Sequence, residues 1–293
     1  MGSSGEAIEW LVTRVLEALA REEPVHPLAL TLLLRRYCAT NGADLADALG
    51  TALARAAEPH ALQDESSHPA WLSLLAEASS VSDDARLREV AADLIAGLRR
   101  SWSHLLLVEP LMLAIDACLT AAEMVDAREL VPSAVDELER VIGGAYRPGE
   151  GVAHRIDGQP GTRGCLGDHV RSASALLTAY TWTARLPYAM LAEELMQFAH
   201  RRLWDSGEGG FFSGPNGGGA KPFVLNCAAA RVLCRLATLH DSEEYRAAAV
   251  TAPDADYSLD AGRTLSALEP SYRQHGVEGA IYGVALGEWL ARP

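Results

Sequence analysis

Hydrophobic side chains recur at helical spacing along nearly the whole chain, at intervals of three and four residues. This pattern predicts a succession of α-helices whose ends are marked by proline and glycine. Patterns typical of strands are almost absent, and only residues 152–156 and 210–213 are expected to form short ribbons. The predicted helices span residues 5–22, 26–39, 43–57, 68–79, 83–101, 106–123, 126–143, 166–184, 187–203, 221–239, 241–250 and 274–291. The chain is therefore predicted to be all-α.

The predicted helices alternate between two kinds. One kind is rich in alanine and leucine with few charges, as is typical of helices buried on all sides. The other kind carries aspartate, glutamate and arginine on one face, as is typical of helices at the surface. Alternation of the two predicts an inner ring of helices wrapped by an outer ring, and six such pairs close into an (α/α)6 toroid, with short turn ribbons between hairpins. No linker divides the chain, so residues 1–293 are expected to form one domain. The apolar helices lie at 28–38, 111–122, 172–182 and 223–237, and the amphipathic ones at 43–57, 83–100, 126–140 and 241–249.

One segment of the chain occurs twice in tandem. Residues 119–151 and 177–209 both begin with Leu-Thr-Ala, pass through an amphipathic stretch and end in a turn that contains Gly-Glu-Gly. Helix starts and turns are both offset by 58 residues, since Leu119 corresponds to Leu177 and Gly151 to Gly209. A fixed period of this size indicates one supersecondary unit used repeatedly. The copies differ at the preceding helix start, where residues 108–110 read Val-Glu-Pro and residues 166–169 read Leu-Gly-Asp-His.

Composition restricts the classes of partner. Hydrophobic residues make up 49% of the chain, which indicates a globular protein with a substantial core. The formal net charge of −14 argues against nucleic acid and anionic membrane surfaces, because both require clustered lysine and arginine. The N-terminal segment carries Glu6 and Glu9 where a secretory signal would be cationic. The five cysteines are scattered, and we expect reduced thiols in a cytoplasmic protein. The oligomeric state is left open.

Polar residues recur at the predicted starts of the inner helices. In an α/α toroid these starts ring one mouth of the central cavity, and they offer unpaired amides and positive dipole ends. We expect this mouth to bind a small hydroxylated or anionic ligand, such as a sugar, without a cofactor. The alternative is that these residues only cap helices. The expected ligand-binding residues are His26, His68, Glu109, Asn226, His275 and Glu278.

Asp168 and His169 form the most prominent of these positions. A carboxylate beside an imidazole at a buried helix start is suited to acid–base catalysis, with the helix dipole holding the anion. The alternative is that Asp168 caps its helix and His169 faces solvent. Cys165 adds a further donor, but a zinc site requires another paired ligand and the chain lacks a metal-binding motif, so no metal is expected.

From about residue 104 to 250, the order of elements resembles the helical domain of the thioredoxin-domain-containing, spermatogenesis-associated proteins. That family is similar in turn to the N-acylglucosamine 2-epimerase and six-hairpin glycosidase superfamily. The 293 residues contain neither the thioredoxin-like domain nor the CxxC of that family. The resemblance rests on Leu166-Gly167-Asp168, the turn from Trp204 to Phe212, Asn226, residues 241–246 and, upstream, His26-Pro27.

This resemblance implies a carbohydrate-type (α/α)6 barrel, either a sugar isomerase or epimerase or a glycoside hydrolase. Asp168 and His169 would be the acid–base residues, and the other polar residues would lie across the cavity. A second hypothesis is a non-catalytic remnant that acts as a binding or scaffold module. Its support is the replacement of polar segments of the family, for example by Ala114-Ile115-Asp116-Ala117. A central cavity lined by polar side chains favours the first hypothesis.

Overall fold

The computed structural model describes residues 2–58, 62, 64–79, 81–159, 161–215, 220–248 and 251–292. Helices account for most of this part of the chain. They are α1 (Gly2–Ala20), α2 (Pro27–Thr40), α3 (Ala43–Ala56), α4 (His68–Ala78), α5 (Ala85–Ser101), α6 (Val108–Ala121), α7 (Leu130–Ala145), α8 (Leu166–Thr183), α9 (Leu186–Leu203), α10 (Phe223–Asp241), α11 (Glu243–Ala248), α12 (Tyr257–Leu268) and α13 (Ala280–Leu290), with 3-10 turns η1 (Glu65–Ser67) and η2 (Tyr272–Gly279).

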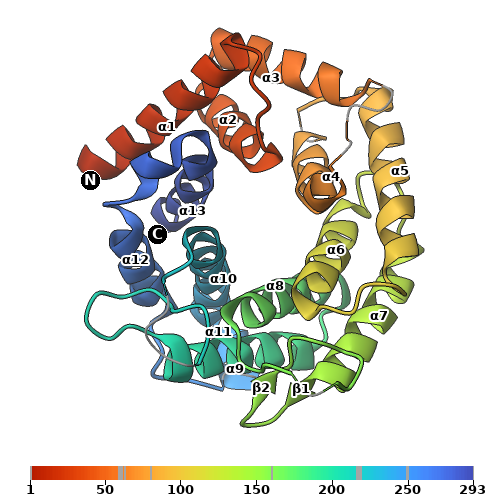
Figure 1. Ribbon diagram of the computed structural model, residues 1–293, viewed down its shortest axis with the longest axis vertical. Helices are drawn as coiled ribbons and strands as arrows, with labels where there is room; N and C mark the ends of the chain where they lie inside the picture. Colours follow the sequence, from red (N-terminus) through yellow and green to blue (C-terminus); the bar gives the residue numbers. More distant parts are fainter. Residues whose placement is uncertain are drawn as a thin grey trace.

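The helices form two concentric rings (Figure 1). In the inner ring, α2 packs against α4, α4 against α6, α6 against α8, α8 against α10, and α10 against α13, which closes the circle on α2. Helices α1, α3, α5, α7, α9 and α12 surround it. Buried hydrophobic side chains between the rings form a core cluster that extends from Ala7 to Leu286. The predicted (α/α)6 toroid is therefore confirmed.

The 58-residue repeat corresponds to two successive hairpins of helices. Helices α6 and α8 begin at Val108 and Leu166, and helices α7 and α9 are followed by equivalent turns. Both turns contain a glycine in the left-handed region, with φ of 74° at Gly151 and 83° at Gly209. This conformation favours glycine, so the repeated Gly-Glu-Gly is explained by backbone geometry. In the first copy the turn pairs strands β1 (Tyr146–Arg147) and β2 (Gly151–Val152).

The structure differs from the predicted elements near the C-terminus. Helix α12 was not predicted, although Asp256 caps it by accepting a hydrogen bond from the Leu259 amide at 2.8 Å. The expected helix over 274–291 begins only at Ala280. Gly276 breaks it, because its φ of 54° and ψ of −127° are incompatible with a helix. Residues 210–213 contribute an isolated bridge between Trp204 and Phe211 instead of a ribbon. The end of the predicted helix 241–250 lies outside the described residues.

Helix α10 is long and apolar enough to cross a membrane by composition alone. In the structure it belongs to the inner ring, and 61% of its most apolar 18-residue stretch is buried inside the protein. It also carries Arg231 and Arg235 towards polar partners on α8 and α13. The same composition therefore serves a core helix.

Candidate functional site

The first turn of α8 holds a fully buried carboxylate, Asp168, which contacts a histidine from another segment. The Nδ1 atom of His154 lies 3.0 Å from Oδ2 and 3.2 Å from Oδ1 of Asp168. His154 follows β2, and its carbonyl accepts a hydrogen bond from the Val108 amide at 3.0 Å. An isolated bridge between Leu107 and Arg155 holds the same segment across the start of α6. The His154 amide also donates to the Thr162 carbonyl at 2.9 Å, and Ala153 bridges Arg163, so pairing with the residues just before α8 brings His154 to the start of that helix.

The two members of this pair differ in their access to solvent. The Asp168 side chain is 0% exposed, whereas 38% of the His154 side chain is exposed. Burial raises the pKa of Asp168 to about 6, although the hydrogen bond and charge of His154 act in the opposite direction. Nearby Glu109 contributes a further upward shift through its negative charge. Within the described residues, Nε2 of His154 has no hydrogen-bond partner, so the imidazole is the member of the pair that can meet a ligand.

Glu109 lies in the first turn of α6, against the start of α8. A Cβ atom added at Gly167 would overlap the Glu109 carboxylate, so this side chain occupies the space that glycine leaves free. Position 109 of the first repeat corresponds to position 167 of the second, since the offset is 58 residues. The difference between the two copies therefore places a second carboxylate beside Asp168.

His169 was expected to be an acid–base residue, but its surroundings favour a structural role. It is 0% exposed. Its Nδ1 lies 2.9 Å from the Cys165 carbonyl, and its Nε2 accepts a hydrogen bond from the Val152 amide at 3.2 Å. Burial lowers the pKa of His169 to about 4, which keeps the ring neutral near pH 7. Both nitrogens hold backbone in place, and the ring stacks on Phe198.

Two other expected ligand-binding residues are also engaged within the protein. The Asn226 amide accepts a hydrogen bond from the Phe211 amide at 2.7 Å and donates to the Phe211 and Pro222 carbonyls at 2.9 and 3.0 Å. It therefore fastens the turn after α9 to α10. His275 lies in η2 instead of at a helix start, and its ring stacks on Phe223 with centroids 3.8 Å apart.

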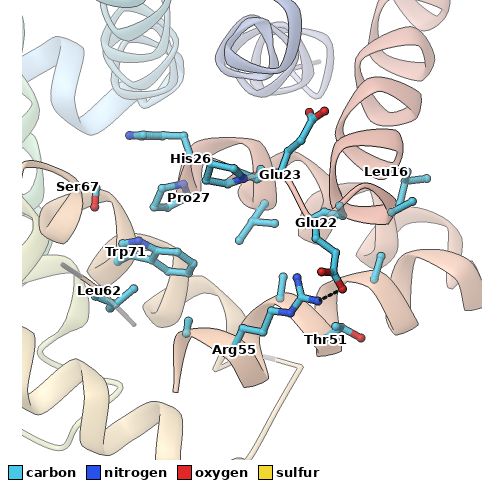
Figure 2. Close-up of a pocket in the computed structure, with 18 of the residues that line it drawn as sticks. Leu16, Glu22, Glu23, His26, Pro27, Thr51, Arg55, Leu62, Ser67 and Trp71 are labelled. Carbon is cyan, nitrogen blue, oxygen red and sulfur yellow. Dashed lines mark hydrogen bonds and ion pairs between the residues drawn. The ribbon is translucent and has the colours of Figure 1, made fainter. Parts of the chain in front are cut away.

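His26 lies on the other side of the ring from Asp168. It caps α2, because its Nδ1 accepts a hydrogen bond from the Leu28 amide at 3.2 Å. Burial lowers its pKa, and the charges of Glu278 and Asp64 act in the opposite direction. His26 borders a cavity of about 880 Å³ whose lining also includes Trp71 of α4 (Figure 2). The remaining walls come from α1, α3, the segment between α1 and α2, and the residues just before α4.

His68 borders a different cavity, of about 1200 Å³, between α4, α5 and α6. Its Nε2 lies 3.1 Å from the Leu62 carbonyl, which anchors the ring beside the segment before η1. The expectation that all candidate residues converge on one cavity is therefore wrong. The structure groups Glu109 and Asp168 with His154, while His26 and Glu278 lie near Asp64 on the opposite arc.

The donor atoms of His154, Cys165 and Asp168 lie within 4.8 Å of one another. This set matches the nitrogen, sulfur and oxygen donors that zinc takes. Burial raises the pKa of the Cys165 thiol, and the charges of Asp168 and Glu109 raise it further. A metal would therefore have to displace the thiol proton as well as the hydrogen bond between His154 and Asp168.

His154 and Arg171 were not among the expected site residues. The sequence did hold a signal for His154, because the repeat aligns it with Phe212 and so marks it as a polar residue that the second copy lacks. Arg171 follows Asp168 by three residues and therefore shares its face of α8.

No known family profile matches the chain, and no curated protein matches it in sequence. Solved structures do match its shape. The chain has the (α/α)6 fold. An unsaturated glucuronyl hydrolase from Bacillus sp. GL1 aligns with a TM-score of 0.73 at 12% identity, over 98% of this chain and 96% of the other. A D-mannose isomerase aligns with a TM-score of 0.62 at 13% identity, over 91% and 86%. The GH76A alpha-1,6-mannanase from Salegentibacter sp. HEL1_6 aligns with a TM-score of 0.60 at 13% identity, over 98% and 99%.

At these identities the similarity shows the fold and not the reaction. The three structures belong to the six-hairpin glycosidase-like group that the sequence resembled. The finer resemblance to the spermatogenesis-associated family finds no support in these comparisons and stays a prediction.

Proposed function

We propose that the protein is a sugar isomerase or epimerase that works at the starts of α6 and α8. The proposal rests on the hydrogen-bonded pair of His154 and Asp168, in which the carboxylate is fully buried and the imidazole is partly exposed. A histidine oriented by a carboxylate through Nδ1 presents its Nε2 as a base, and the carboxylate stabilises the imidazolium that forms. A D-mannose isomerase shares the fold, which gives this reaction class a precedent by analogy.

In this reaction His154 removes a proton from the carbon next to the sugar carbonyl and returns it to the neighbouring carbon or to the opposite face. Glu109 accepts hydrogen bonds from the adjacent hydroxyls and carries their protons during the rearrangement. Asp168 acts as a positioning residue, because its burial prevents contact with the sugar. It lies in the first turn of α8, where the helix dipole favours its ionised form.

Hydrogen exchange at carbon tests the proposal. The protein is incubated in D2O with a panel of aldoses, ketoses, N-acylhexosamines and sugar phosphates. Proton NMR follows loss of the signal of the hydrogen on the carbon next to the carbonyl, which is C2 in aldoses and N-acylhexosamines and C1 or C3 in ketoses. We expect exchange or conversion of at least one sugar with the wild type, and a loss of about 100-fold or more with His154→Gln. The matched control is His104→Gln, which removes an exposed histidine and should leave the rate unchanged.

Two outcomes would overturn the assignment. Cleavage of aryl glycosides without any exchange at carbon would make the protein a hydrolase, as are two of the proteins that share its fold. Neither exchange nor cleavage with any sugar would favour the non-catalytic binding module. The glycosides are therefore added to the same panel.

A further inference from the structure

Charged side chains from several inner helices meet inside the ring, about two turns beyond the helix starts. Arg35 of α2 pairs with Glu77 of α4 and with Glu288 of α13, both at 2.6 Å. Arg231 of α10 pairs with the same Glu288 at 2.9 Å. The side chains of Arg231 and Glu288 remain 33% and 24% exposed, so solvent reaches the inside of the ring. Each of these two arginines has a carboxylate partner.

A second group lies beside the first, between α6, α8 and α10. The Asp116 carboxylate accepts hydrogen bonds from the hydroxyls of Ser174 and Thr178, both at 2.6 Å. Arg235 donates to the Ser174 hydroxyl and carbonyl at 3.2 and 3.1 Å, and to the Thr178 hydroxyl at 3.1 Å. The two hydroxyls thus link the guanidinium to the carboxylate, and Arg235 is satisfied as well.

Arg171 differs from these three arginines. It lies on α8 between Asp168 and Ser174, three residues from each, so it neighbours both on the surface of the helix. Within the part of the chain that the structure describes, it forms no hydrogen bond or ion pair, and its Nε is buried without a partner. Burial lowers its pKa, while the charges of Glu109 and Asp116 raise it without either carboxylate forming an ion pair.

A guanidinium remains protonated in proteins, so Arg171 brings an unmatched positive charge to the face of α8 that carries Asp168. Burying such a group without a partner is costly, and a partner that arrives with the ligand removes this cost. The planar fork of donors suits the two oxygens of a carboxylate or a phosphate. The overall charge of −14 opposes general attraction of anions, so anion binding here requires a local arginine.

We propose that Arg171 binds an anionic group of the sugar, a carboxylate or a phosphate, and so makes the protein specific for acidic sugars. This inference rests on the ligand site of the proposed function. The anionic group is held at Arg171, and the carbonyl end of the sugar meets His154 near the start of α8. Glu109, whose charge acts on both Asp168 and Arg171, receives hydroxyls between these two ends.

Calorimetric titration of the whole protein tests the inference with four probes: glucose, glucuronate, glucose 6-phosphate and inorganic phosphate. We expect at least one acidic sugar to bind about 30-fold or more tightly than glucose, as a charge-assisted double hydrogen bond provides. Arg171→Met should abolish this preference, and Arg171→Lys should retain part of it. Comparison of glucuronate with glucose 6-phosphate decides between carboxylate and phosphate. Inorganic phosphate shows whether the anion is recognised without the sugar.

Arg231→Met is the matched control, because it removes a paired guanidinium from the inside of the ring. We expect this variant to keep the preference for the acidic sugar. Arg171→Met should melt at or above the wild-type temperature, since it removes an unpartnered charge, so lost binding cannot be attributed to unfolding.

Equal affinity for glucose and both acidic sugars, or an unchanged preference in Arg171→Met, would overturn the inference. Binding of an acidic sugar without hydrogen exchange would leave the inference intact and contradict the proposed reaction. Hydrogen exchange with neutral sugars alone would support the proposed reaction and contradict the inference about acidic sugars.

Discussion

The carboxylate of Glu109 occupies the space beside Gly167. Gly167 is the residue that corresponds to Glu109 in the second copy of the repeat, 58 positions later. The contact places a carboxylate near Asp168 and depends on the missing side chain at position 167. The first copy of the repeat therefore supplies the carboxylate, and the glycine of the second copy leaves the space that this carboxylate occupies. The contribution of this carboxylate's placement to activity can therefore be tested without removing any polar group.

Gly167→Ala should reduce activity without unfolding the protein. The added methyl group overlaps the Glu109 carboxylate and displaces it, while alanine favours the helix at a position whose φ is not positive. We expect kcat/KM to fall about 10-fold or more, with a melting temperature within a few degrees of the wild type. Gly50→Ala in α3 is the control, because its added Cβ meets nothing within 4 Å. Equal loss of activity in both variants would contradict the role of Glu109.

The pH dependence of activity should follow Asp168. Its pKa of about 6 means that the carboxylate that orients His154 is ionised above this pH. We therefore expect kcat/KM to rise between pH 5 and 7. Asp168→Asn should lower kcat/KM about 100-fold or more and remove the rise near pH 6. A profile shared by wild type and variant would assign the rise to another group.

The same variant should be more stable than the wild type at neutral pH. The folded pKa lies above the ordinary value of 3.8, so the folded protein binds an additional proton between these two values. The stability associated with the protonated carboxyl is complete below pH 3.8 and is lost as the pH rises through about 6. Asp168→Asn avoids this loss, and we expect its free energy of unfolding at pH 7 to be higher by about 2 kcal/mol. Denaturant titration at pH 4 and pH 7 measures the difference, and an equal effect at both pH values would be inconsistent with it.

His154 and His169 should respond to substitution in opposite ways. His169→Phe leaves the Val152 amide without a partner and removes one of the two donors to the Cys165 carbonyl, and should cost about 2 kcal/mol of stability. The pH profile of the remaining activity should not change. His154→Gln should remove the activity at a cost in stability below about 1 kcal/mol, because the ring is partly exposed. Loss of the pH-dependent step in His169→Phe with its fold intact would restore the acid–base role first expected for this residue.

Glu193 is a buried anchor outside the candidate site. Its carboxylate accepts hydrogen bonds from His240 at 2.7 Å, Tyr257 at 3.1 Å and the Thr251 amide at 2.9 Å. Burial alone raises its pKa, but the bonds from Thr251 and His240 outweigh this and hold the pKa below the usual value of 4.5. Its contribution to stability is therefore complete above pH 4.5 and lost as the pH falls through the folded value.

Glu193→Gln should cost roughly 3 kcal/mol at pH 7, with a smaller difference from the wild type in acid. Melting curves at pH 7 and at pH values down to 3 measure both effects, because the folded pKa lies below 4.5. Gln197→Ala is the nearby control on the same helix, because it removes only one hydrogen bond to Tyr257. A difference from the wild type that does not shrink in acid would show that the carboxylate charge is not the cause.

The ring could be predicted from the sequence because the two helix classes and the 58-residue repeat are local patterns. Helix α12 was not predicted because its apolar stripe is short and polar residues such as Asp260 and Arg263 interrupt the pattern in the sequence. The stripe consists of Tyr257, Ala261 and Leu265. Asp168 and Glu109 were expected at the site because they occupy helix starts. His154 was not expected, since only long-range backbone pairing brings its loop to α8.

The partners of the remaining candidates also lie beyond sequence spacing. Asn226 accepts a hydrogen bond from the Phe211 amide, 15 residues away in the sequence. His169 accepts one from the Val152 amide, 17 residues away. Residue type and position at a helix start do not distinguish such a structural role from binding. The unsatisfied Arg171 becomes visible only when the partners of the other arginines are known.

The position of a bound sugar is the most direct test of the proposed site. A crystal structure of Asp168→Asn with the sugar that the wild type converts measures it. We expect the carbonyl end of the sugar within hydrogen-bonding distance of His154 Nε2 and Glu109, and its anionic group at Arg171. Density for the sugar in the cavity beside His26 and Trp71 instead would contradict the account.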